Sequence, residues 1–89
     1  MIHKTVVICN KLGLHARAAA KLVHLSARFA SEIQLKKNDR TVNGKSIMGV
    51  MMLAASKGTE LELIATGEDE AEAITALEHL VVNKFGEGE

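Results

Sequence analysis

Aromatic residues are nearly missing from this 89-residue sequence, which has two phenylalanines, no tryptophan and no tyrosine. Its core must therefore be built from aliphatic side chains, and it lacks the rings on which single-stranded nucleic acids stack. The formal net charge is zero, so no basic excess attracts nucleic acid or an anionic membrane. No apolar run is long enough to cross a bilayer. We therefore expect neither a nucleic-acid partner nor a membrane partner.

Cysteine occurs once, at Cys9, so an internal disulfide is excluded. The N-terminal segment has no basic stretch followed by an apolar one, and it therefore does not resemble a secretory signal peptide. Both features favour a cytoplasmic protein. Neither Cys9 nor the four histidines show metal-ligand spacing, so no metal and no other cofactor is expected.

Apolar residues make up 47% of the chain, which is enough for a packed core. The length is typical of one small domain, and we expect that domain to span residues 1–89. Alternation of apolar and polar residues predicts a first strand with Val6 and Ile8 on its buried face. Strands are predicted over residues 2–9, 32–36 and 60–66, and around Thr41 and Val42.

Apolar residues at helical spacing predict three helices, over residues 16–28, over 47–53 and from Asp69 to about Lys84. Ser46 is placed to cap the second helix, and Asp69 with Glu72 resembles a capping box for the third. The tail, residues 86–89, is expected to be frayed. The element order β-α-β-β-α-β-α predicts an α+β fold, a two-layer open-faced sandwich with a four-stranded antiparallel sheet and three helices on one face.

The most informative stretch is residues 13–17, GLHAR, at the junction of the first strand and the first helix. It places His15 just ahead of the helix and Arg17 in its first turn. A helix N-terminus attracts anions, and a neutral imidazole nitrogen can attack a phosphoryl donor. The pattern favours a histidine that takes up a phosphoryl group and hands it on. The alternative is that His15 only caps the helix.

Three segments, NKLGLHAR at 10–17, NGKSIMGVM at 43–51 and ATGEDE at 65–70, resemble the HPr phosphocarriers of the bacterial phosphoenolpyruvate-dependent phosphotransferase system. The resemblance covers nearly the whole chain. Residues 10–13 are also similar to the nitrogen-branch paralogue NPr, whereas the segment around Ser46 resembles the sugar branch, so the branch stays open. One departure is Ala18, because the family usually has proline directly after the arginine.

The resemblance implies a phosphohistidine on Nδ1, the pros nitrogen, of His15. It also implies that Arg17 stabilises the phosphate, for which a guanidinium is suited. A solvated surface charge is the alternative for Arg17. Ala18 has a backbone N–H that proline would lack, and we expect the N–H groups of Ala16 and Ala18 to contribute to the same phosphate site.

Ser46 has two interpretations, a helix cap and a regulatory phosphorylation site. The resemblance implies the second, which requires a serine kinase and phosphorylase as a partner. Phosphoserine adds a charge of about −1.5 to −2, and this charge would disfavour docking of an acidic or apolar partner.

Methionines and other apolar residues crowd the segment after Ser46. A single short helix cannot bury all of them against one sheet, so some must be exposed, and adaptable methionine surfaces suit a protein with several partners. The predicted docking surface around His15 consists of Leu14, Ile47, Met48 and Met51.

The predicted function is that of a phosphocarrier. It accepts a phosphoryl group on His15 from a phosphorylated first enzyme and passes it to an A-type second-enzyme acceptor. It is a component of a phosphotransfer chain more than a stand-alone enzyme, and we expect a monomer. The alternative is a regulatory binding module whose phosphorylation state, at His15 and Ser46, controls partner proteins.

Overall fold

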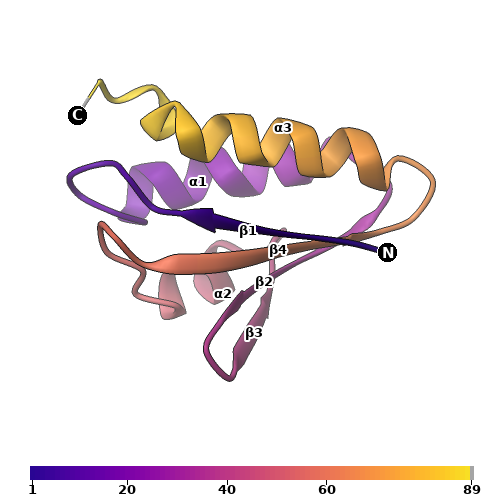
Figure 1. Ribbon diagram of the computed structural model, residues 1–89, viewed down its shortest axis with the longest axis horizontal. Helices are drawn as coiled ribbons and strands as arrows, with labels where there is room; N and C mark the ends of the chain where they lie inside the picture. The colour runs from indigo at the N-terminus through magenta and orange to yellow at the C-terminus, as the bar shows by residue number, and fades with distance from the viewer. Residues whose placement is uncertain (89) are drawn as a thin grey trace.

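Four antiparallel strands form one sheet in the computed structural model, which describes residues 1–88 (Figure 1). The strands are β1 (Ile2–Val7), β2 (Glu32–Lys37), β3 (Arg40–Asn43) and β4 (Glu60–Thr66). Their order in the sheet is β1-β4-β2-β3, so the first strand pairs only with the last, with Val6 opposite Leu61. The predicted antiparallel sheet is confirmed.

Two long helices, α1 (Ala16–Ser26) and α3 (Glu70–Val82), lie side by side over one face of this sheet (Figure 1). The short helix α2 (Ile47–Met52) packs against α1 and β3. A 3₁₀ turn, η1 (Lys84–Gly86), follows α3. The α+β architecture is confirmed. Within residues 1–88, no helix is both long and apolar enough to span a bilayer.

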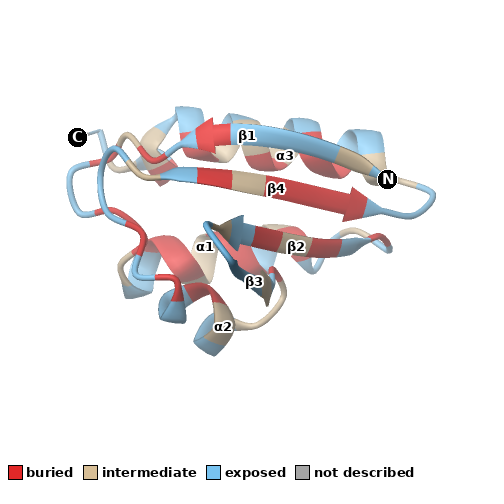
Figure 2. Ribbon diagram, turned by 60° about the horizontal axis from the view of Figure 1, so that its bottom comes forward, coloured by how far each residue is buried: buried red, intermediate tan, exposed pale blue. Residues whose placement is uncertain are grey.

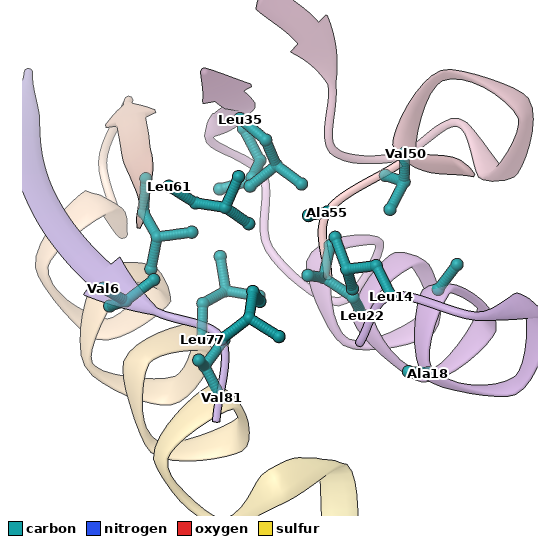
Figure 3. Close-up of a cluster of buried hydrophobic side chains, with 14 of the residues drawn as sticks. Val6, Leu14, Ala18, Leu22, Leu35, Val50, Ala55, Leu61, Leu77 and Val81 are labelled. Atoms are coloured by element: carbon teal, nitrogen blue, oxygen red, sulfur yellow. The ribbon is translucent and has the colours of Figure 1, made fainter. Parts of the chain in front are cut away.

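The core lies between the sheet and the helices and is almost entirely aliphatic (Figure 3). Val6 of β1 and Ile8, which directly follows the strand, are buried in it, as the alternation predicts, although the strand ends at Val7 and not at residue 9. Figure 2 shows that β1, at the edge of the sheet, is largely exposed, whereas β4, inside the sheet, is largely buried. Phe85, which is only 1% exposed, enters this core from the C-terminal end of the chain, and Phe29 packs against it.

Asp69 begins α3, but its side chain makes no bond to that helix. Its carboxylate instead accepts the backbone N–H groups of Ala30 and Ser31, each at 2.9 Å, and the Ser31 hydroxyl. The Ser31 hydroxyl and then the Ala30 N–H are the main causes that lower the pKa of Asp69 below its ordinary value. The predicted capping box with Glu72 is wrong, because a partner distant in sequence holds the carboxylate.

Candidate functional site

The loop ahead of α1 is held by a close approach of two backbone segments. The Leu14 N–H donates to the Ala55 carbonyl at 2.8 Å. Gly13 has a φ of +65°, and a Cβ atom there would lie 2.5 Å from the same Ala55 oxygen. Only glycine combines this left-handed conformation with this contact at no steric cost. The chain is thereby fixed in position immediately before His15.

Leu14 is 5% exposed and points into the core beside Leu22 and Ala55 (Figure 3). Its predicted place in a docking surface is wrong. Leu14 thus anchors the loop from the core side, and the side chain of the next residue, His15, is partly exposed.

His15 is the N-cap residue of α1, with an extended backbone at φ −70° and ψ 176°. Its carbonyl accepts the Ala19 N–H at 2.9 Å, while its side chain makes no capping bond. The backbone alone therefore begins the helix. The imidazole is 28% exposed and takes no part in capping.

Glu87 contacts the imidazole from the C-terminal end of the chain. One carboxylate oxygen, Oε2, is paired with Nε2 of His15. The other, Oε1, accepts the Asn10 side-chain amide at 3.0 Å, and Asn10 is fully buried in the loop ahead of the site. The predicted frayed tail is therefore wrong for Gly86 and Glu87, and Glu89 lies outside the described residues.

Hydrogen bonds and nearby cations lower the pKa of Glu87. The Asn10 amide is the largest cause, and the His15 hydrogen bond and the positive charges of His15 and Lys21 act in the same direction, against the effect of burial. The carboxylate is therefore ionised at neutral pH. It serves the imidazole as a hydrogen-bond acceptor only.

A surface depression of about 420 Å³ surrounds His15 and carries three cationic side chains. Arg17 lies in it, exposed and, within residues 1–88, without an ion pair. The N–H groups of Ala16, Arg17 and Ala18 precede the first intrahelical bond of α1. Ala16 and Arg17 are exposed, so their N–H groups are open to an anion at this end, whereas Ala18 is fully buried. The depression is lined by Lys11, Leu12, His15, Arg17, Lys21, Gly86 and Glu87.

Ser46 is the N-cap residue of α2, as predicted, and its hydroxyl accepts the Gly49 N–H at 3.1 Å. Ile47 and Met51 are each 41% exposed, and Met48 is 73% exposed. These side chains are open to a partner, but α2 does not line the depression at His15. The structure therefore places the apolar residues beside the site, on the helix packed against α1, and not around the ring.

Among the residues of the site that were not predicted from the sequence are Lys21, Asn10 and Glu87. Lys21 lies one turn beyond Arg17 on α1, and this i,i+4 spacing is a signal that could have found it. Asn10 and Glu87 carry no local signal, since their contact spans 77 positions. Among residues 1–88, no three His, Cys, Asp or Glu side chains are grouped to hold a metal ion.

A family model described as "PTS HPr component phosphorylation site" matches residues 2–83. The chain is 56% identical to the phosphocarrier protein HPr of Neisseria meningitidis and 53% identical to that of Cupriavidus necator, with 100% of each chain covered in both cases. The crystal structure of HPr-C-His from Thermoanaerobacter tengcongensis superposes with a TM-score of 0.95 at 49% identity, covering 98% of each chain.

Proposed function

The chain belongs to the HPr family and is a phosphocarrier of the phosphotransferase system, and from this premise we propose that His15 carries the phosphoryl group. One observation carries the proposal. His15 begins α1 with its backbone alone, so its ring is available in a depression with three cations and the free N–H groups of a helix end. That environment favours the negative charge of a phosphoryl group.

The family exchanges phosphoryl groups with enzymes I and II of the system. In the proposed reaction the lone pair on Nδ1 of His15 attacks the phosphorus atom of phosphorylated enzyme I. A P–N bond forms while the donor's bond to phosphorus breaks, and the donor atom keeps that electron pair. The imidazole becomes positively charged. Transfer to an A-type domain of enzyme II reverses these events, and the electron pair returns to Nδ1.

Arg17 is proposed to stabilise the phosphoryl group during both transfers, together with the N–H groups of Ala16 and Ala18. The guanidinium is exposed at the rim of the depression, so it can follow the group without enclosing it. A carrier must release what it binds, and a charge-assisted hydrogen bond contributes only about 1.5–3 kcal/mol. The open site therefore suits transfer better than storage.

The exposed side chains of Ile47, Met48 and Met51 are proposed to contact both enzymes during transfer. Flexible methionine side chains adapt to different partner surfaces. Leu12, which is 65% exposed, lines the depression and adds apolar surface at the site itself. The site is formed within one chain, and we propose that the protein acts as a monomer in the cytoplasm.

Ser46 is proposed as a second phosphorylation site, used by a serine kinase and phosphorylase. The residue is half-buried at the start of α2, next to the exposed Ile47 and Met48. A phosphate there would add negative charge to the apolar docking surface and weaken it. Incubation with such a kinase, followed by mass spectrometry with Ser46→Ala as control, tests this; no mass increase in the wild-type protein contradicts it.

Incubation with enzyme I and radiolabelled phosphoenolpyruvate tests the phosphocarrier site. The wild-type protein should take up an acid-labile label and pass it to an A-type domain of enzyme II, whereas His15→Ala should take up none. His79→Ala, which removes an exposed histidine on α3, is the matched control and should be labelled normally. Label that persists in His15→Ala would show that another residue carries the phosphoryl group.

A further inference from the structure

The last described residues form a strap that returns from α3 to the start of α1. After α3 ends at Val82, Lys84 and Phe85 both adopt left-handed backbone angles, with φ of +56° and +55°. The Phe85 side chain is buried, and its carbonyl accepts the Lys21 ammonium at 2.6 Å. A core side chain and a bond to α1 thus hold the strap in place and carry Glu87 to the imidazole.

The carboxylate of Glu87 is oriented from both of its oxygens. Oε1 accepts the amide of Asn10, whose same nitrogen also donates to the Gly13 carbonyl at 2.8 Å. Oε2 is thereby aimed at Nε2 of His15. Since Asn10 is fully buried, this orientation rests on the folded loop and not on a mobile surface contact.

A carboxylate beside one ring nitrogen selects the tautomer of a neutral histidine. An ionised carboxylate only accepts hydrogen bonds, so the nitrogen it contacts must carry the proton. The charged groups around the ring are Glu87 on the strap, Lys11 on the loop, and Arg17 and Lys21 on α1. Glu87 is the one acceptor among them, so it decides which nitrogen is protonated.

We propose that Glu87 is a positioning residue that holds the proton of His15 on Nε2, so that Nδ1 keeps its lone pair for phosphorus. This inference rests on the proposed function of His15. Within residues 1–88, Nε2 is the ring nitrogen that makes a hydrogen bond, and Nδ1 makes none. When Nδ1 forms the P–N bond, the ring becomes cationic with its proton still on Nε2, and the Glu87 carboxylate is its counter-ion.

Nitrogen-15 NMR of the unphosphorylated protein tests the tautomer directly. The wild-type His15 should be protonated on Nε2, and in Glu87→Ala the fraction protonated on Nδ1 should rise several-fold. Glu68→Ala removes an exposed carboxylate ahead of α3 and is the matched control, which should match the wild type. An unchanged His15 spectrum in Glu87→Ala overturns the proposal. This readout needs no phosphoryl donor, so it stands even if another residue carries the phosphoryl group.

Transfer kinetics test the consequence for the reaction. In Glu87→Ala the turnover with phosphorylated enzyme I should fall about 10- to 100-fold, the range seen when the carboxylate partner of a metal-binding histidine is removed. The KM for enzyme I should change little, because the docking residues are untouched. Glu87→Gln, which keeps the size and removes the charge, should also slow transfer. Wild-type turnover in both variants overturns the proposal.

Discussion

The helices α1 and α2 begin in opposite ways. At the start of α2 the Ser46 hydroxyl accepts the Gly49 N–H, so the side chain serves its own helix. At the start of α1 the His15 backbone begins the helix alone, and its ring contacts Glu87. Losing a side-chain cap costs a helix about 1 kcal/mol. Helix α1 therefore gives up local stability at the place where the imidazole acts.

The difference follows from how each helix is held. Helix α1 has 11 residues and buries Ala18, Leu22 and Val23 in the core, among others. Helix α2 has six residues, and Val50 is the one it buries. Tertiary packing supplies most helix stability in proteins. The well-packed helix can leave its first residue free for chemistry, whereas the short helix depends on its cap.

The largest effect is expected for His15→Ser, which gives α1 the same N-cap residue type as α2. Phosphorylation by enzyme I should be lost completely, because no ring nitrogen remains. The variant should nevertheless unfold at a higher temperature than His15→Ala by about 4–8 °C, which corresponds to a cap of about 1 kcal/mol in a domain of this size. Label incorporation and thermal unfolding measure the two effects. Equal melting temperatures would show that a side-chain cap has no value at this helix end.

Arg17→Ala leaves the helix start intact and removes its fixed charge. Transfer from enzyme I should slow by about 10- to 100-fold, which is the loss of one charge-assisted hydrogen bond of about 1.5–3 kcal/mol. Rapid-quench kinetics give the rate. Arg28→Ala removes an equal charge beyond the other end of α1 and should transfer normally. If the two variants behave alike, Arg17 acts only as general surface charge.

Ser46→Ala removes the cap from the helix that depends on it. The free energy of unfolding should fall by about 1 kcal/mol, as measured by urea denaturation. Phosphoryl transfer at His15 should stay near the wild-type rate, because the hydroxyl takes no part in that site. A stability equal to that of the wild type would mean that α2 is held by packing after all.

Ala18→Pro gives the smallest expected effect and tests the free N–H groups of α1. Proline suits the first helical turn and should raise stability by about 0.4–1 kcal/mol through the unfolded chain. It also removes one N–H, and transfer should slow about 2- to 10-fold, the value of a hydrogen bond of about 0.5–1.5 kcal/mol. Unchanged transfer in a more stable variant would exclude this N–H from the phosphate site.

Local periodicity predicted the secondary structure well, because the strands and helices here expose one face and bury the other. The boundaries of β4 and the cap at Ser46 are as predicted, and α1 ends two residues earlier. Within α3, Ala71 at its start is exposed, whereas Ala73 is buried. Alanine is small enough for either environment, so it marks a helix face poorly.

The part of the site formed by residues close in sequence could be predicted, whereas the part formed by residues distant in sequence could not. His15 and Arg17 stand two positions apart at a helix start, and their chemistry is evident from residue types. The contact of Glu87 with His15 and that of Ser31 with Asp69 form only when the chain folds, and no spacing in the sequence indicates them. The prediction for Leu14 was wrong because a position next to His15 in the sequence does not determine which way the side chain points.

The strap has a consequence for the order of events during synthesis. Among the strands of residues 1–88, β1 pairs with β4 alone, so the sheet stays open until residue 66 has been made. The contact between His15 and Glu87 then joins residues 72 positions apart, nearly the whole chain. The sheet can therefore close once residue 66 is available, whereas the site also needs residue 87. The contact that orients the imidazole is thus among the last that the growing chain can make.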